Sequence, residues 1–185
     1  FVSSDNEKII KISKKYNVKT IFRSQKLSKD NTPEILVWKN ALKEFEKKFS
    51  YLPKKILILP PTSPLRNLND IKRCIKKYQS KKFNLVISGH SSNNNPYFNM
   101  VKKTGDFVKI ISNKGIFRRQ DAPKVYNIST ACYIINTNYL MKVKNIFKSK
   151  VGLVEIPKER SIDIDDELEL FIANKIYEKK RIFSK

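Results

Sequence analysis

Short aliphatic runs alternate along this chain with stretches in which apolar side chains recur every three or four positions. The short runs are typical of buried strands, and the longer period is typical of helices that lie on a sheet. Strands are predicted at residues 1–4, 18–22, 56–59, 85–88, 131–135 and 151–156. Because helical patterns fall between them, the sequence predicts an α/β fold with three layers, in which helices flank a mostly parallel sheet.

Two of the predicted helices have a clear apolar face. The first face consists of Ile9, Ile12, Ser13 and Tyr16, and the second consists of Ile35, Trp38, Leu42 and Phe45. Such faces are expected to pack on the sheet. We therefore interpret Trp38 as a core residue and not as a platform for a ligand.

Residues 96–121 interrupt this alternation of strands and helices. Two strands around Thr104-Gly105-Asp106 are predicted to form an inserted β-hairpin. Its apolar positions predict one face that is buried against a site or a partner. We expect a single domain over residues 1–185 that carries this insertion.

The composition limits the classes of protein that fit. A chain of 185 residues with 40% hydrophobic content can bury one substantial core. No apolar run approaches the roughly 18 residues that a membrane span needs, so we expect a cytoplasmic protein without a membrane partner. The formal net charge of +22 leaves nucleic-acid binding open as an alternative. We favour a solvated surface, because the charge comes mostly from lysines spread along the whole chain.

Against this basic background, the stretch SIDIDDELEL is strongly acidic. In an extended segment Asp163 and Asp165 point to the same side, which gives a hard cation such as Mg²⁺ two carboxylate ligands. The alternative is helix capping, in which Asp165 or Asp166 caps a helix that begins near Glu167, with Glu169 at the capping-box position. We favour Asp163 and Asp165 as metal ligands and residues 166–169 as the start of the helix.

The stretch LPPTSPLR is predicted to follow a strand, at the edge of the sheet where such folds bind ligands. Hydroxyls of Thr62 and Ser63 suit a phosphate or a sugar, and Arg66 suits an anion. The alternative is a proline-stiffened turn in which Asn69 caps the next helix.

Three other features carry possible chemistry. In RRQDAP, Arg118 and Arg119 suit a carboxylate or a polyphosphate, although a solvated basic loop fits as well. His90, the only histidine, is interpreted as a surface loop residue. Cys74 and Cys132 are interpreted as buried thiols, because their spacing supports neither a zinc site nor a disulfide framework.

Together the motifs VSSD, PTSPLR, NPY, RRQDAPKVY and ERSIDIDDELEL occur in this order. In this respect the chain resembles the acylneuraminate cytidylyltransferases, also called CMP-nonulosonic acid synthetases, over nearly its whole length. The resemblance implies a nucleotide-diphospho-sugar transferase-like, Rossmann-like fold. It also implies that CTP and an acidic nonulosonic sugar react to give a CMP-sugar and pyrophosphate, in a homodimer formed through the hairpin.

The resemblance also implies roles for individual residues. Asp163 and Asp165 would be the catalytic pair that holds Mg²⁺. The residues implied to contact the nucleotide are Arg23, Thr62, Ser63 and Arg66. The residues implied to contact the sugar acid are Arg119, Gln120, Ser129 and Tyr133.

The chain departs from the family pattern in ways that bear on its substrate and activity. Pro60 replaces a glutamine, and STACY replaces NGAIY, so we expect a nonulosonic acid other than sialic acid. The opening FVSSD aligns with a strand well inside the family fold. We therefore expect this chain to be N-terminally incomplete, to lack the glycine-containing phosphate loop and not to turn over CTP by itself. The alternative is a non-catalytic nucleotide-binding or sugar-binding remnant of the fold.

Overall fold

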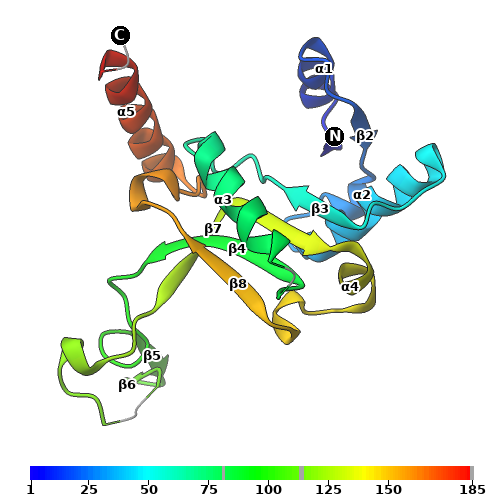
Figure 1. The fold of residues 1–185 in the computed structure, drawn as a ribbon. Coiled ribbons are helices and arrows are strands. Elements are labelled where there is room, and N and C mark those ends of the chain that lie inside the picture. The colour runs from blue at the N-terminus through cyan, green and yellow to red at the C-terminus, as the bar shows by residue number, and fades with distance from the viewer. Residues whose placement is uncertain (81, 113–114, 184–185) are drawn as a thin grey trace. The chain divides into compact units, whose positions relative to one another are not determined.

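A computed structural model describes residues 1–80, 82–112 and 115–183 (Figure 1). The chain divides into two compact units. The first comprises Phe1–Ile56 and Ile135–Ser149, and the second comprises Leu57–Ile134 and Lys150–Lys185. The expectation of one domain over residues 1–185 stays a prediction. Within the described ranges, no helix has the length and apolarity that crossing a membrane requires.

Strands and helices follow one another much as the sequence pattern predicts. The strands are β1 (Val2–Ser4), β2 (Thr20–Phe22), β3 (Lys55–Ile58), β4 (Leu85–Ser91), β5 (Val101–Thr104), β6 (Phe107–Ile110), β7 (Tyr126–Asn136) and β8 (Val151–Glu155). The α-helices are α1 (Glu7–Lys15), α2 (Glu34–Phe49), α3 (Leu68–Gln79), α4 (Thr137–Lys142) and α5 (Glu167–Phe183). The 3-10 turns are η1 (Gln25–Leu27), η2 (Arg119–Asp121), η3 (Ile146–Lys148) and η4 (Lys158–Arg160).

In the first unit, β1 and β2 form a parallel pair connected by α1. The predicted core face of α2 is confirmed, because Trp38 and Leu42 are buried. The predicted core face of α1 is wrong: Ser13 is its only buried member, whereas Ile9 and Ile12 are exposed. The Ser13 hydroxyl donates to the Ile9 carbonyl at 2.8 Å, so this buried polar group is satisfied within the helix.

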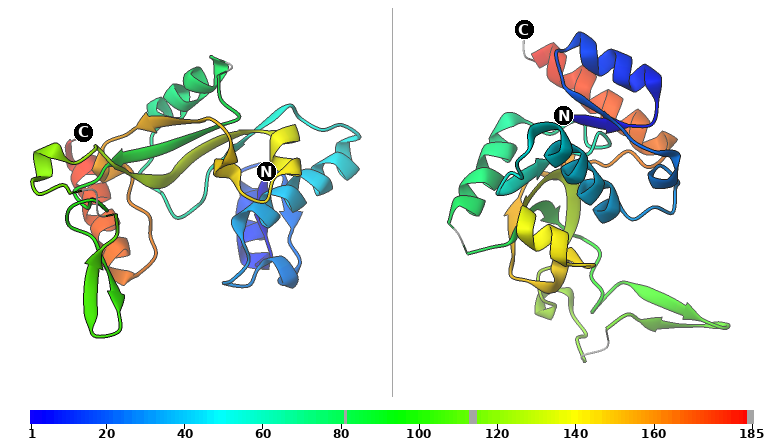
Figure 2. Two further views of the ribbon diagram at one scale, coloured as in Figure 1. Left: turned by 90° about the horizontal axis from the view of Figure 1, so that it is seen from below. Right: turned by 90° about the vertical axis from the view of Figure 1, so that its right-hand side faces the viewer.

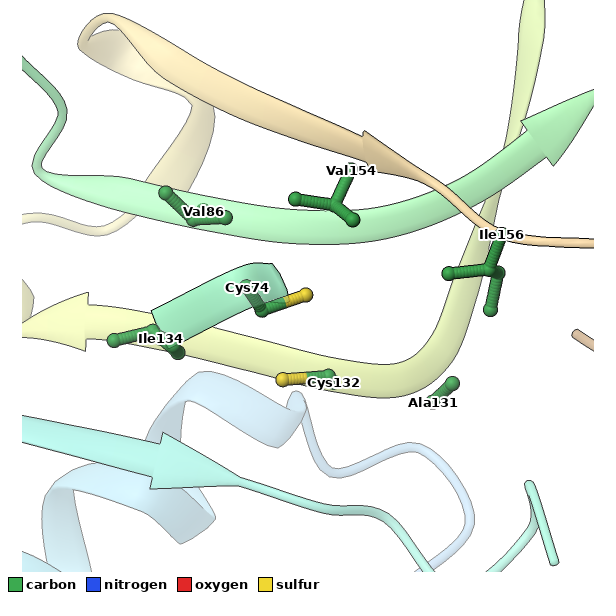
Figure 3. Close-up of a cluster of buried hydrophobic side chains, with 7 residues drawn as sticks. All are labelled: Cys74, Val86, Ala131, Cys132, Ile134, Val154 and Ile156. Carbon is green, nitrogen blue, oxygen red and sulfur yellow. The ribbon is translucent and has the colours of Figure 1, made fainter. Parts of the chain in front are cut away.

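Most of the four-stranded sheet lies in the second unit, and its strand order is β3-β7-β4-β8. β4 and β8 are parallel, with Leu85 opposite Val151. Figure 3 shows that β7 runs in the opposite direction to β3, β4 and β8. The predicted α/β fold with a mostly parallel sheet is therefore confirmed. The carboxyl ends of β3, β4 and β8 meet the beginning of β7 at one edge of this sheet, which we call the carboxyl edge.

The core of the second unit lies between this sheet and α3, which covers one face of it (Figure 2). Its buried members are Cys74, Val86, Ala131, Cys132, Ile134, Val154 and Ile156 (Figure 3). Both cysteines are buried free thiols, as the sequence predicts. A hydrogen bond to Cys74, together with burial, raises the pKa of the Cys132 thiol.

The predicted hairpin is confirmed. β5 and β6 pair antiparallel with Thr104 opposite Phe107, and Gly105 takes a φ of +61° in the turn, where glycine is favoured. Figures 1 and 2 show that the hairpin projects away from the sheet. Phe107 and Val108 are exposed, so the described chain does not itself bury the apolar face that the sequence predicts.

Gly89 in β4 is packed closely against the backbone of β7. A Cβ atom at this position would lie 2.6 Å from the Asn127 carbonyl oxygen, so a larger residue requires a shift of the backbone. We expect Gly89→Ala to lower the free energy of unfolding by about 1–3 kcal/mol, measured by chemical denaturation. Gly152→Ala is the matched control, because the three atoms nearest its new Cβ belong to the side chains of Phe83 and Val86. A larger loss of stability for Gly152→Ala than for Gly89→Ala would contradict this prediction.

Candidate active site at the carboxyl edge

Three segments of the second unit meet at the carboxyl edge: the loop of residues 60–66 after β3, the beginning of β7, and the acidic segment, defined here as residues 161–169 after β8. The Ile164 amide donates to the Thr62 carbonyl at 2.9 Å, which joins the acidic segment to the loop. The fully buried Ser63 hydroxyl lies 2.5 Å from the Thr130 hydroxyl, which joins the loop to β7. Residues that are far apart in the sequence are thus brought together.

Asp163 and Asp165 carry the features expected of a cation site. Asp163 Oδ1 is buried and has no hydrogen-bond partner among the described residues. The pKa of the exposed Asp165 carboxyl is raised, chiefly by the negative charge of Asp163. It is unfavourable to bury a hydrogen-bond acceptor without a donor, and it is also unfavourable to place two negative carboxylates close together. A bound cation would interact with the buried oxygen and would reduce the repulsion between the two carboxylates. The residues therefore fit Mg²⁺, although their role as ligands stays a prediction.

The described residues contain no group of three or more His, Cys, Asp or Glu side chains that is able to hold a metal. This finding is compatible with a two-carboxylate site, because Mg²⁺ commonly binds one or two carboxylates together with water and phosphate oxygens. The site would then be completed by the substrate.

The rest of the acidic segment builds the start of α5. Asp166 Oδ1 accepts a hydrogen bond from the Glu169 amide at 2.9 Å, and Glu169 Oε2 accepts one from the Asp165 amide at 2.8 Å. The first bond satisfies an amide that the first turn of a helix leaves free, so the helix-capping interpretation is confirmed for Asp166. Glu169 binds the amide of Asp165, the residue before the cap, and not the Asp166 amide as in a capping box.

Arg66 braces the loop that contains it. Its Nε donates to the Ser63 carbonyl at 2.7 Å, and its Nη2 donates to the Pro60 carbonyl. Burial lowers the pKa of Arg66, and the Asp163 carboxylate nearby opposes that shift. Arg66 is thus a fixed positive charge close to the candidate cation site. Its predicted contact with a nucleotide, like those of Thr62 and Ser63, stays a prediction.

The helix after this loop begins differently from the sequence prediction. Asn67, and not Asn69, caps α3: its Oδ1 accepts a hydrogen bond from the Asp70 amide at 2.9 Å. Asn69 lies inside the helix, where its side chain cannot serve the first turn.

The predicted sugar-binding residues lie in η2 and along β7. Arg118 forms two bonds with Asp121, at 2.7 and 2.9 Å, which leaves the exposed guanidinium of Arg119 outside that pair. Gln120 is exposed beside it. The two β7 residues implied for the sugar, Ser129 and Tyr133, are both buried in the second unit. Their contacts with a sugar stay predictions.

Arg23 belongs to the first unit. It follows β2, and its guanidinium contacts Asp5 at 3.3 Å and Ser28 at 2.9 Å. These contacts are within the first unit, and the predicted contact of Arg23 with a nucleotide stays a prediction.

His90 lies in β4 and is half-buried, so its assignment to a surface loop is wrong. The Ser161 hydroxyl donates a hydrogen bond to the Lys158 carbonyl at 2.8 Å and lies 2.8 Å from His90 Nδ1, so its oxygen accepts a hydrogen bond from the N–H group at Nδ1. Nε2 is then the acceptor that faces the Asn127 amide at 3.4 Å. The sequence pattern predicts a strand that ends at residue 88, whereas β4 continues to Ser91. His90 falls outside the predicted strand because the apolar run has ended before it.

We expect His90 to make stability dependent on pH. Burial, with a contribution from the positive charge of Lys158, lowers the pKa of His90 below its ordinary value of 6.5. The unfolded chain therefore binds this proton more readily, so stability is lost as the pH falls through the window below 6.5. Unfolding free energies measured from about pH 7 to about pH 5 should fall less steeply for His90→Gln than for the unchanged protein. Equal slopes would contradict the prediction.

Sequence reasoning also missed Asp70 and Arg160. Asp70 is 1% exposed and forms a paired interaction with Arg160. The only local signal for Asp70 is its position three residues after Asn67, which is typical of a capping box. No local pattern indicates that Arg160 is its partner, because the two are far apart in sequence.

Comparison with solved structures shows the class of fold. The chain is similar to 4-diphosphocytidyl-2C-methyl-D-erythritol synthase from Anaerococcus prevotii, with a TM-score of 0.60 and 18% identity over 94% of this chain and 77% of that one. It is also similar to a CMP:2-keto-3-deoxy-manno-octonic acid synthetase complexed with CTP, with a TM-score of 0.63 and 11% identity over 96% and 80% of the two chains. The chain thus has the α/β fold of these nucleotidyltransferases.

Sequence comparison is more specific. No family model matches the chain. It is 29% identical to the post-translational flagellin modification protein B of Campylobacter coli and 29% identical to the CMP-N,N'-diacetyllegionaminic acid synthase of Campylobacter jejuni, over its whole length and 79% of each relative. It is 26% identical to an N-acylneuraminate cytidylyltransferase of Streptococcus agalactiae, over 89% of this chain and 39% of that one. The resemblance to acylneuraminate cytidylyltransferases is thereby confirmed.

Proposed function

We propose that this protein is a CTP-dependent nucleotidyltransferase that transfers CMP to the anomeric hydroxyl of a nonulosonic sugar acid and releases pyrophosphate. The observation that carries the proposal is the carboxyl edge itself. There, Asp163 Oδ1, which has no hydrogen-bond partner among the described residues, lies with Asp165 and near the fixed charge of Arg66. The names of the sequence relatives support transfer of a cytidylyl group to an acidic sugar, and the solved neighbour that is complexed with CTP supports CTP as the donor.

Asp163 and Asp165 would hold Mg²⁺, which would neutralise charge on the triphosphate and on the pyrophosphate that leaves. The remaining work of the protein is to position the substrates. A bond forms between the anomeric oxygen and the α-phosphorus, and the bond from that phosphorus to the bridging oxygen of the pyrophosphate breaks. Such a reaction depends on alignment and charge neutralisation more than on covalent help from the protein.

The loop of residues 60–66 and η2 supply groups for the two substrates in this proposal. Thr62 and Arg66 suit the phosphates, because a hydroxyl and a guanidinium donate hydrogen bonds to phosphate oxygens. Arg119 suits the sugar carboxylate, because its planar fork can donate two parallel bonds, and Arg118 does not compete since Asp121 engages it.

Among nonulosonic acids, we propose a substrate of the legionaminic type before sialic acid. The legionaminic acid synthase is 29% identical to this chain and matched over 79% of its length, whereas the N-acylneuraminate enzyme of Streptococcus agalactiae is 26% identical and matched over 39% of its length. The buried Pro60 and the STACY stretch agree with a sugar pocket that differs from that of sialic acid enzymes.

Pyrophosphate release from CTP and Mg²⁺ tests the proposal directly, with N,N'-diacetyllegionaminic, pseudaminic and N-acetylneuraminic acids as the panel. Release with one or more of these acids would support the proposal, and the fastest acid would identify the substrate. The same result would contradict the sequence-based expectation that residues 1–185 do not turn over CTP by themselves. Binding of CTP with Mg²⁺ but no release with any acid would support the alternative of a non-catalytic remnant.

We further propose that the hairpin forms a homodimer. Phe107 is 75% exposed and Val108 is 63% exposed, and apolar side chains at a projecting element are typical of a protein interface. Sedimentation should show a dimer that Phe107→Asp converts to a monomer, whereas Leu168→Asp, at a similarly exposed position of α5, should leave the dimer intact. A dimer that survives Phe107→Asp would place the interface elsewhere.

A further inference from the structure

An ion pair ties the turn before the acidic segment to the start of α3. Arg160 Nε lies 2.7 Å from Asp70 Oδ2, and Arg160 Nη2 lies 3.0 Å from Asp70 Oδ1. Asp70 is 1% exposed, so this is a bidentate pair with a buried carboxylate. It connects residues that are 90 positions apart in the sequence.

Asp70 is itself fixed by the backbone at the start of α3. Its amide donates to Asn67 Oδ1 at 2.9 Å, and its Oδ2 accepts a hydrogen bond from the Asn67 amide at 3.4 Å. Asn67 directly follows Arg66, the residue whose hydrogen bonds hold the loop of residues 60–66. The pair with Arg160 therefore attaches the turn before the acidic segment to the end of that loop.

A second attachment lies on the other side of Asp163. The Ile164 amide donates to the Thr62 carbonyl at 2.9 Å. Asp163 is thus held between Arg160 and Ile164, each of which is bonded to the part of the chain that runs from the loop into α3. Asp163 Oδ1 has no hydrogen-bond partner among the described residues, so at that oxygen no bond fixes the carboxylate.

We propose that Asp70 and Arg160 are positioning residues, whose ion pair acts with the Ile164–Thr62 hydrogen bond to hold Asp163 against the loop of residues 60–66. The inference rests on the proposed function, in which Asp163 binds the cation. A role in positioning is also what the energetics favour, because a buried ion pair is often no more stabilising than apolar residues of similar size. The bidentate geometry instead fixes the position of the turn before the acidic segment relative to the start of α3.

The test uses the full chain and two readouts other than turnover: hydrogen exchange at the Ile164 amide, and Mn²⁺ binding followed by electron paramagnetic resonance. The first variant combines Asp70→Asn with Arg160→Met, which removes both charges and leaves no unpaired buried carboxylate. We expect exchange at Ile164 to accelerate at least about tenfold and Mn²⁺ affinity to fall by about tenfold, as is typical when a supporting residue of a metal site is lost.

Arg160→Lys is the second variant. It keeps the charge but loses the fork, so we expect an intermediate effect on both readouts. Lys47→Met is the matched control, because it removes an exposed ion pair with Glu44 in the first unit, and it should change neither readout. Wild-type exchange at Ile164 and wild-type Mn²⁺ affinity in the double variant, even with a lowered melting temperature, would overturn the proposal.

Failure of the proposed function would be visible separately. Mn²⁺ affinity that is unchanged by Asp163→Asn would remove the role of Asp163 as a ligand. Faster exchange at Ile164 in the Arg160 variants would still show that the ion pair positions this segment, whereas unchanged exchange would overturn the positioning role as well.

Discussion

Asp163→Asn is expected to weaken Mg²⁺-dependent binding of CTP by about 100-fold or more, the scale seen when one preorganised electrostatic group is removed from an active site. The melting temperature should stay the same or rise, because the substitution removes the charge that repels Asp165. Calorimetric titration of CTP with and without Mg²⁺, followed by thermal unfolding, measures both effects.

Asp166→Ala is the control for this experiment. It removes the side chain that accepts the Glu169 amide, so it should cost about 1 kcal/mol of stability while Mg²⁺-dependent CTP binding persists. Unfolding caused by Asp163→Asn, with CTP binding retained in the folded fraction, would favour a structural role for Asp163.

Arg119→Lys is expected to raise the KM for the sugar acid by roughly 10- to 100-fold, which corresponds to about 1.5–3 kcal/mol for hydrogen bonds to a charged group. Lysine keeps the charge but cannot form the two parallel bonds of the guanidinium. The affinity for CTP should be nearly unchanged, because this residue is proposed to contact the sugar alone.

Arg118→Lys is the matched control. It alters the neighbouring guanidinium, which is already bonded to Asp121, so the KM for the sugar acid should change much less than in Arg119→Lys. Equal losses of affinity for the sugar and for CTP in Arg119→Lys would contradict the carboxylate role.

Features that depend only on neighbouring residues could be predicted from the amino-acid sequence alone. Strand positions followed from short apolar runs, the hairpin followed from Gly105 in its turn, and the cap at Asp166 followed from the spacing to Glu169. Each of these depends on contacts within a few positions, so local periodicity and turn chemistry are sufficient to predict them. The order of the motifs indicated the family for the same reason, because it is a property of the chain alone.

Features that depend on how distant segments pair became visible only in the folded structure. The reversed direction of β7, the half-buried position of His90 and the exposed face of α1 could not be read from local patterns. The same is true of the bond between Asp70 and Arg160, which are 90 residues apart. A periodic pattern indicates which side of a helix or strand is apolar. Strand order and loop closure determine which other part of the chain packs against that side. The carboxyl edge exists only because the sheet brings the ends of β3, β4 and β8 together.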